Sequence, residues 1–153
     1  IGQLYNAFTP IQLVNFVSSI GNGGKLYTPH LIRKKVDSTG EVYNTEIHYR
    51  DTTAKESTIK AVQKGMVAVA NSEDGTAVEI FKDFPFDVAA KTGTAETGRL
   101  DSDGNPICHA WFAGFTPLND PRFVIVVFSE EAGSGGEVAA PVFKKIAAGL
   151  LLQ

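Results

Sequence analysis

Cysteine is nearly absent from this sequence, which excludes several kinds of site. Cys108 is the only cysteine among 153 residues, so neither a disulfide framework nor a cysteine-based metal site can form within the chain. No apolar run reaches the roughly 18 residues that a membrane-spanning helix needs. Basic residues are not in excess, because 14 Lys and Arg stand against 17 Asp and Glu. Without a basic surface we expect no nucleic-acid partner, and the sequence indicates no metal or other cofactor.

The sequence does contain enough apolar material for a buried core. Hydrophobic residues make up 43% of the chain and charged residues 20%, a balance typical of globular proteins. The length suits one domain or a part of one. Apolar spacing predicts helices over residues 10–20 and 55–71, and a last helix that begins near Pro141. Extended segments are predicted at residues 25–36, 41–49, 87–94, 108–115 and 123–128.

Each predicted helix has a set of apolar residues that we expect to face the core. Thr9 can cap the first helix, and Pro10 suits its first turn. In that helix the expected buried residues are Ile11, Val14, Val17 and Ile20. In the second they are Ile59, Val62, Met66 and either Val69 or Ala70. In the last they are Val142, Phe143, Ile146, Ala147 and Leu150.

The extended segments predict an antiparallel sheet. The turn sequence Ser38-Thr39-Gly40 joins residues 25–36 to 41–49 as a hairpin. Residues 123–128 are apolar on both faces, which is typical of a central strand that is covered on both sides. Only residues 116–122 link them to 108–115, and so short a link favours an antiparallel pair. We therefore expect an α+β fold with an antiparallel sheet flanked by helices, and a flexible hinge at Gly133–Gly136.

The stretch from Val88 to Thr94 is the most informative candidate site. Lys91 follows a small apolar run, and the hydroxyls of Thr92 and Thr94 share one face of a strand. Gly93 has no side chain, so a ligand can lie against the backbone there. A cation, two hydroxyls and backbone amides suit an anionic ligand with a developing oxyanion. These residues alone also allow a second interpretation without a ligand. In it the segment is an edge strand, and Lys91 only prevents pairing with a strand of another chain.

The surrounding segments carry a family resemblance. Lys91-Thr92-Gly93 is the K-T-G motif found in β-lactamases and penicillin-binding proteins. It is followed by His109-Ala110-Trp111-Phe112-Ala113-Gly114 and Glu137-Val138-Ala139-Ala140-Pro141, and is preceded by Gly2-Gln3, Thr9-Pro10-Ile11-Gln12-Leu13 and Asn22-Gly23-Gly24. In order and spacing this series resembles class B penicillin-binding proteins, above all the penicillin-binding protein 2 type and its sporulation relatives. The resemblance covers nearly the whole chain.

The resemblance implies a D,D-transpeptidase that cross-links peptidoglycan stem peptides through a serine acyl-enzyme, on a serine β-lactamase/penicillin-binding fold. It implies that Lys91 supplies positive potential and a proton-relay hydrogen bond. Thr92, Gly93 and Thr94 would bind the carboxylate of the terminal D-alanine or of a β-lactam antibiotic, and the Thr94 N–H would be an oxyanion donor. It also implies a cell-wall glycosyltransferase partner and a membrane anchor, with this domain on the extracytoplasmic side.

The sequence departs from the family in one respect that concerns catalysis. The family's nucleophilic serine lies in an S-x-x-K motif well upstream of K-T-G, with an S-x-N motif between the two. Ser57-Thr58-Ile59-Lys60 fits S-x-x-K but lies too close to Lys91, with no S-x-N between them. We interpret Ser57 as a helix cap. Residues 1–153 are thus expected to be the C-terminal portion of a transpeptidase domain, soluble but inactive without the nucleophile half.

Two further interpretations of the function stay open. A non-catalytic β-lactam-sensing or scaffold module would keep the same strand, and so would an antibiotic-hydrolysing relative. Apolar surface left uncovered in an incomplete domain would favour a dimer. Asp101-Ser102-Asp103-Gly104-Asn105 looks like the start of a calcium loop, but Phe112 stands where the final Glu belongs. A solvated turn is the better interpretation.

Overall fold

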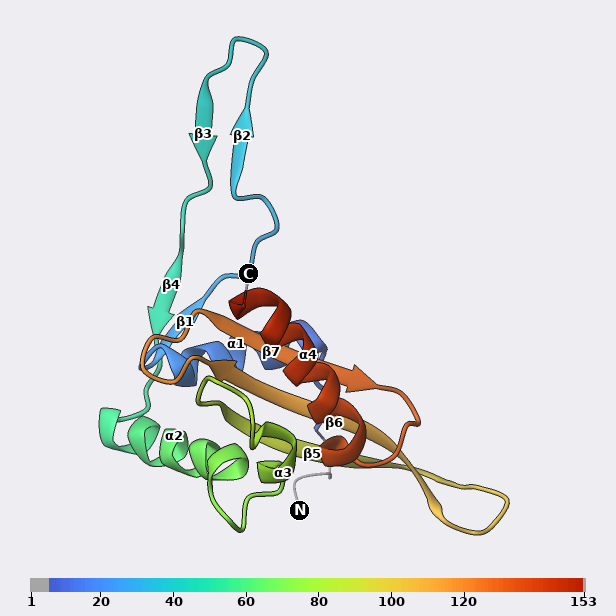
Figure 1. Ribbon diagram of the computed structural model, residues 1–153. Coiled ribbons are helices and arrows are strands. Elements are labelled where there is room, and N and C mark those ends of the chain that lie inside the picture. The colour runs from blue at the N-terminus through green and yellow to red at the C-terminus, as the bar shows by residue number, and fades with distance from the viewer. Residues whose placement is uncertain (1–5, 153) are drawn as a thin grey trace.

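An antiparallel sheet forms the centre of the molecule. The computed structural model describes residues 6–152, so Gly2 and Gln3 lie outside the described residues. The sheet has the order β5–β6–β7, formed by β5 (Ala89–Leu100), β6 (Pro106–Thr116) and β7 (Phe123–Ser129). Helices pack on it, as Figure 1 shows. The predicted α+β architecture with an antiparallel sheet is therefore confirmed.

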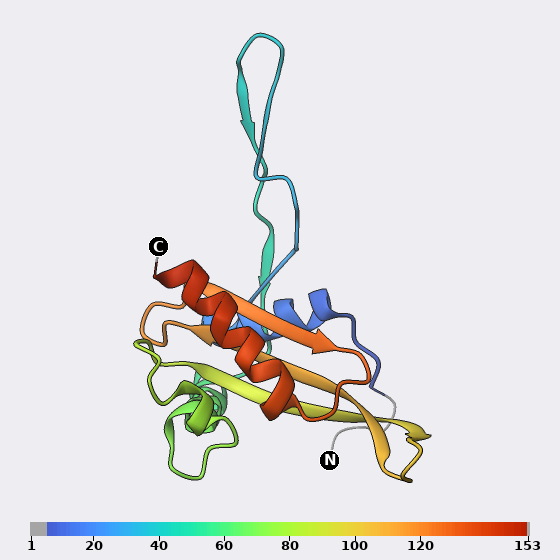
Figure 2. The same ribbon diagram turned by 45° about the vertical axis from the view of Figure 1, so that its right-hand side comes forward.

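Helices cover both faces of this sheet. One face packs against α4 (Ala140–Leu151) and the short α3 (Val78–Phe81), and the other packs against α1 (Pro10–Gly21). α2 (Glu56–Asn71) lies along β5, at the edge of the sheet. A five-residue π-helix, η1 (Gly135–Ala139), leads directly into α4. The view in Figure 2 shows α4 crossing the sheet.

The two faces have separate hydrophobic cores. Below α4, the rings of Phe81, Phe112 and Phe143 lie with centroids 5.0 to 5.9 Å apart. On the opposite face, Val17 of α1 and Met66 of α2 pack with Phe115. Burial of a large apolar side chain stabilises a fold by about 1.5–3 kcal/mol. Both faces of β5 and β6 are therefore fixed by packing, and this holds the Lys91–Thr94 segment in place.

The predicted hairpin is present, but its strands are interrupted. Its base pairs β1 (Lys25–Tyr27) with β4 (Tyr49–Asp51), and its outer part pairs β2 (Lys34–Val36) with β3 (Val42–Asn44). Pro29 lies in the gap between β1 and β2, where its missing N–H is not needed for pairing. The outer part projects far from the body of the molecule (Figures 1 and 2), and all residues of β2 and β3 are exposed.

Two predictions about the strands and helices were wrong. Residues 123–128, expected in the centre, form β7 at an edge of the described sheet, and β6 takes the central place. α1 and α4 cover both faces of β7, which explains its apolar pattern without a central position. Several predicted inward residues are exposed instead, namely Ile11, Val62, Val142, Ile146 and Leu150.

The start of α1 is as predicted. Thr9 accepts a hydrogen bond from the backbone N–H of Gln12, and the Gln12 side chain accepts one from the backbone N–H of Thr9, so the two residues form a capping box. Such a box satisfies two of the N–H groups that a helix start leaves without partners.

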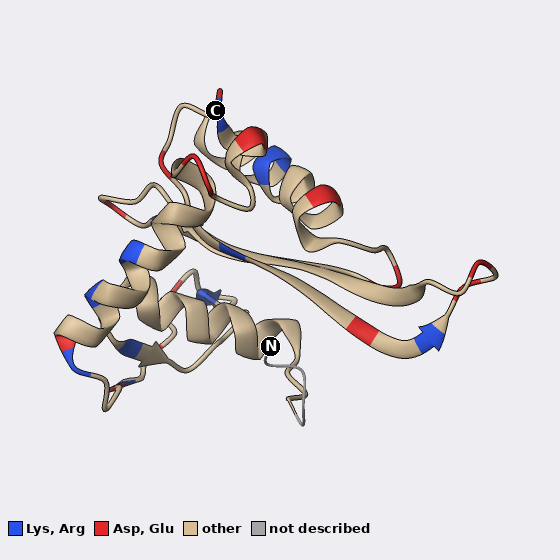
Figure 3. Cartoon of the chain, turned by 90° about the horizontal axis from the view of Figure 1, so that it is seen from below, with Lys and Arg blue, Asp and Glu red and all other residues tan. Residues whose placement is uncertain are grey.

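Charged residues of both signs occur throughout the fold. Figure 3 shows acidic and basic residues on helices, strands and loops. Within residues 6–152, no helix is long and apolar enough to cross a membrane.

Candidate functional site

The Lys91–Thr94 segment lies on β5, at an edge of the described sheet. Lys91 is paired with Ala113 of β6, and Thr94 with Ala110. Because side chains alternate along a strand, Lys91 and Gly93 face the α1 side, whereas Thr92 and Thr94 face the α4 side. An edge strand also directs every second pair of its backbone groups away from the sheet. A ligand can thus reach side chains and backbone of this segment together.

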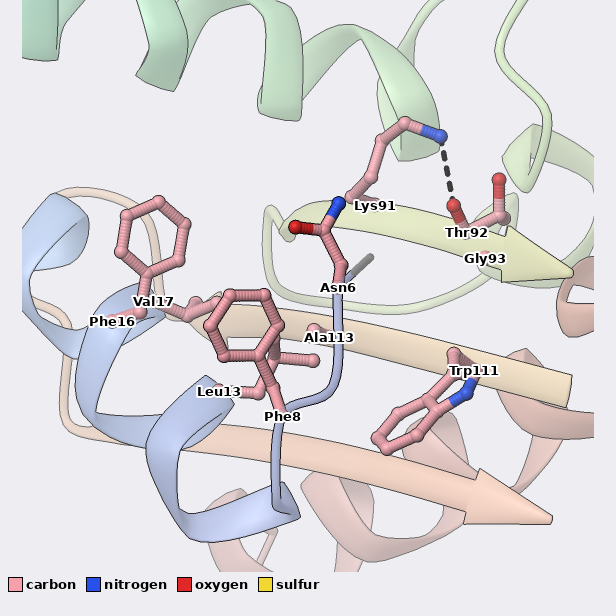
Figure 4. Close-up of a pocket in the computed structure, with 10 residues that line it drawn as sticks. All are labelled: Asn6, Phe8, Leu13, Phe16, Val17, Lys91, Thr92, Gly93, Trp111 and Ala113. Carbon is pink, nitrogen blue, oxygen red and sulfur yellow. Dashed lines mark hydrogen bonds between the residues drawn. The ribbon is translucent and has the colours of Figure 1, made fainter. Parts of the chain in front are cut away.

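Lys91 borders an apolar hollow between β5, β6 and α1. Its side chain is exposed, and its Nζ donates a hydrogen bond of 2.8 Å to the backbone oxygen of Thr92. Figure 4 shows this contact beside the hollow. The hollow has a volume of about 340 Å³ and is lined by Asn6, Phe8, Leu13, Phe16, Val17, Lys91, Thr92, Gly93, Trp111 and Ala113. A cation at the rim of an apolar hollow attracts an anionic group while neighbouring surface binds an apolar one.

The two threonines contact segments that are distant in the sequence. Thr94 Oγ1 accepts a hydrogen bond of 3.2 Å from the backbone N–H of Gly135, at the start of η1. Thr92 Oγ1 lies 3.2 Å from Thr76 Oγ1, in the loop between α2 and α3. The structure therefore brings together three hydroxyl groups and a backbone amide from three parts of the chain. Hydrogen-bond donors gathered in this way suit a carboxylate.

Sequence reasoning missed Thr76 and misjudged Gly135. A Cβ on Gly135 would lie 2.2 Å from the backbone oxygen of Gly93 and 2.3 Å from that of Trp111. Gly135 is buried, so the Gly135 end of the predicted hinge packs tightly against β5 and β6 and is not a free joint. The adjacent glycines Gly135 and Gly136 could have indicated this packing from the sequence, because glycines also mark places where two backbones approach closely.

Ser57 is not a helix cap, and its neighbour Lys60 has another partner. α2 begins at Glu56 after Lys55, which makes no side-chain capping bond, so the predicted role of Ser57 was wrong. Lys60 Nζ lies 2.6 Å from a carboxylate oxygen of Glu56, one turn away. A serine nucleophile needs its base in contact. This ion pair therefore supports the prediction that Ser57-Thr58-Ile59-Lys60 is not the S-x-x-K motif.

The calcium-like sequence forms the turn between β5 and β6. Asp101 Oδ1 accepts hydrogen bonds from the backbone N–H groups of Asp103 and Asn105, at 2.9 and 2.8 Å. The carboxylate thereby stabilises the turn, and these bonds lower its pKa, the Asn105 N–H most of all. Among residues 6–152 no three His, Cys, Asp or Glu side chains gather as metal ligands.

Comparison with known proteins decides the family. Residues 1–148 match the penicillin binding protein transpeptidase domain. The chain belongs to this family. It is similar to the peptidoglycan D,D-transpeptidase MrdA of Haemophilus influenzae, with 33% identity over 95% of this chain and 24% of that protein. Such relatives place the chain among class B penicillin-binding proteins of the PBP2 type.

Solved structures agree with this assignment. The Pseudomonas aeruginosa PBP2 in complex with WCK 5153 has a TM-score of 0.79 and 30% identity, over 100% of this chain and 32% of that one. The ceftriaxone acyl-enzyme of penicillin-binding protein A from M. tuberculosis has a TM-score of 0.84 and 25% identity, over 99% of this chain and 34% of that one. The chain thus spans about a quarter to a third of the relatives it matches.

Proposed function

We propose that this chain supplies the K-T-G strand of a peptidoglycan D,D-transpeptidase that cross-links stem peptides through a serine acyl-enzyme and binds penicillin. One observation carries the proposal: Lys91 and Thr92 border an apolar hollow at a sheet edge, and the hydroxyls of Thr92 and Thr94 lie on the other face of the same edge strand. The relatives are named as transpeptidases, and one of the similar structures is a β-lactam acyl-enzyme. A peptide that ends in D-alanine has the carboxylate and the small apolar group that such an edge suits.

Each residue of the strand has a distinct role in the proposal. Lys91 holds positive potential beside the nucleophile and takes part in proton transfer. Thr92 and Thr94 donate hydrogen bonds to the substrate carboxylate, and Gly93 leaves room for the substrate backbone. The Thr94 N–H stabilises the oxyanion of the tetrahedral intermediate, a contribution that is typically on the order of 3 kcal/mol of transition-state stabilisation.

The nucleophile is proposed to come from polypeptide outside residues 1–153, so that this chain is the C-terminal portion of its domain and inactive alone. The exposed phenylalanines beside the hollow support this view, because Phe8 and Phe16 are 58% and 59% exposed. Exposed apolar side chains around a hollow mark a surface that another element covers. In the isolated chain the same surface can form a dimer, which light scattering over a range of concentrations detects.

Penicillin labelling tests the proposal directly. The full-length protein that contains this chain and the chain alone are incubated with a fluorescent penicillin and separated under denaturing conditions. We expect covalent label on the former and none on the latter. Label on the isolated chain that disappears with Ser57→Ala would refute both the assignment of Ser57 and the need for a missing half.

A pair of variants at one position separates backbone from side chain. In the full-length protein Thr94→Pro removes both the N–H and the hydroxyl, whereas Thr94→Val removes the hydroxyl alone. We expect Thr94→Pro to abolish acylation and Thr94→Val to retain part of it, because only the first removes the oxyanion donor. Circular dichroism controls for folding. Equal acylation rates in the two variants would contradict the role given to the N–H.

Similar structures also support a proposal about partners. One is part of a peptidoglycan synthase complex that coordinates polymerization and crosslinking, and another is a complex of PBP2 with MreC from Helicobacter pylori. We propose that the full protein works beside a cell-wall glycosyltransferase, anchored in the cell membrane with this domain on the outer side. Co-purification of the two enzymes from detergent-solubilised membranes tests the partnership.

A further inference from the structure

We propose that Thr76 is a positioning residue for the carboxylate site, acting through the hydroxyl of Thr92. The inference rests on the function proposed above and extends it to a residue outside the K-T-G strand. Its starting point is the distance of 3.2 Å between Thr76 Oγ1 and Thr92 Oγ1. The two residues come from different elements, the α2–α3 loop and β5, so their contact depends on how the loop is held.

The loop around Thr76 is fixed to the end of α2. A Cβ on Gly75 would lie 2.4 Å from the backbone oxygen of Ala68 and 2.5 Å from that of Val69. The backbone N–H of Ala77 donates a hydrogen bond of 2.9 Å to the backbone oxygen of Val69, and Ala77 is buried. Tight packing on one side of Thr76 and a backbone bond on the other leave the loop little freedom. The hydroxyl is thus presented by a rigid backbone.

Thr76 also meets the segment that contacts Thr94. A Cβ placed on Gly136 would lie 3.2 Å from the backbone oxygen of Thr76 and 3.8 Å from Cγ2 of Thr92. Its neighbour Gly135 donates its N–H to Thr94 Oγ1. The loop, η1 and β5 therefore border one small polar region. Thr76 and Lys91 further line a common cavity of about 430 Å³, so Thr76 stands at the site and not behind it.

The chemistry of two adjacent hydroxyls assigns the direction of the bond when substrate is present. A hydroxyl has a single hydrogen to donate and two lone pairs to accept with. If Thr92 donates its hydrogen to the substrate carboxylate, the bond between the hydroxyls must run from Thr76 to Thr92. Accepting that bond polarises the Thr92 hydroxyl and strengthens its bond to the carboxylate. Thr76 thereby aligns and strengthens the donor without touching the substrate.

The test measures acylation of the full-length protein by two forms of one penicillin. The first form has its carboxylate, and in the second the carboxylate is a methyl ester, which cannot accept a charge-assisted bond. We expect Thr76→Val, which is close to isosteric, to lower the second-order acylation rate about 3- to 10-fold with the carboxylate form, as for the loss of one hydrogen bond. Thr76→Ser should restore the rate, and the ester should acylate both wild type and Thr76→Val equally.

A double-mutant cycle gives the pairwise contribution. In a Thr92→Val background, Thr76→Val should have no further effect, because its route to the substrate has been removed. An equal loss with acid and ester, or failure of Thr76→Ser to restore the rate, would refute the positioning role and leave a purely structural one. Normal acylation of Thr76→Val would overturn this role alone, whereas a wild type that neither compound acylates would overturn the proposed function as well.

Discussion

The central sheet and the outer hairpin are both antiparallel, yet they are stabilised in opposite ways. β6 has strands on both sides and helices on both faces, with Phe112 and Phe115 buried. The β2–β3 hairpin has two three-residue strands and no buried residue in either. Strands in the sheet are therefore positioned by many long-range contacts, whereas the hairpin depends on its own turn. The K-T-G residues lie in the first region, where geometry is hard to perturb.

The largest expected effect comes from breaking the packing of the sheet. Phe112→Ala removes a fully buried ring that contacts Phe81 and Phe143, and should lower the free energy of unfolding by about 3–5 kcal/mol. Tyr43→Ala in the hairpin removes a ring that is half exposed and should change it by no more than about 0.5 kcal/mol. Denaturation by urea measures both. Similar losses in the two variants would contradict the comparison.

Close approach of two backbones gives the next largest effect. Gly135→Ala forces a methyl group onto the backbone oxygens of Gly93 and Trp111, and we expect a loss of about 1–3 kcal/mol in stability. Gly149→Ala, with nothing within 4 Å of the added carbon, should instead stabilise α4 by up to about 1 kcal/mol. The thermal midpoints of the two variants should move in opposite directions. An unchanged midpoint for Gly135→Ala would show that the loop moves aside freely.

Features set by neighbouring residues in the sequence were predictable. Thr9 caps α1 because the cap needs only Gln12, three residues away, and the turns at Gly40 and Gly104 follow from local composition. The K-T-G strand was located for the same reason, since alternation along β5 is a local property. Its family resemblance added the expected chemistry, and the match of residues 1–148 to the transpeptidase domain confirmed the family.

Features set by distant residues were not predictable. The apolar pattern of β7 indicates that both of its faces are covered, here by helices, but it does not indicate how many strands pair with it. Val62 fits the stripe of α2 and is nonetheless 43% exposed, because spacing does not say which neighbour will cover a face. Thr76 reaches Thr92 across 16 residues through a loop without regular pattern. The packing of Gly75 and Gly136 and the bond from the Ala77 N–H to the backbone oxygen of Val69 place it there.

A smaller effect is expected from straining the two hairpin turns. Gly40 and Gly104 adopt φ of +89° and +85°, and a Cβ added at either would meet no atom within 4 Å. Alanine there costs about 1–2 kcal/mol from backbone strain alone. For Gly40→Ala the loss should appear as faster amide exchange in β2 and β3 without a change in the global midpoint, because the hairpin opens by itself.

Gly40→Asn is the control for this strain and should lose less stability, since Asn tolerates positive φ. A lower global midpoint for Gly40→Ala would show that the hairpin and the sheet unfold together.

The smallest effect concerns the charge that stabilises the hairpin turn. Hydrogen bonds lower the pKa of Asp37 below the ordinary value of an aspartate, and the largest cause is the Thr39 side chain. Because the pKa is lower in the folded hairpin, the carboxylate contributes stability above its unfolded pKa, and this contribution is lost as the pH falls through the folded pKa. Thr39→Val should raise the Asp37 pKa toward its ordinary value.

Asp101 in the β5–β6 turn provides the control, since its lowered pKa depends first on Asn105 and should not change. Carboxyl carbon titration by NMR follows both, and an unchanged Asp37 pKa in Thr39→Val would mean that the backbone N–H groups and the Tyr43 hydroxyl, and not the Thr39 hydroxyl, lower it.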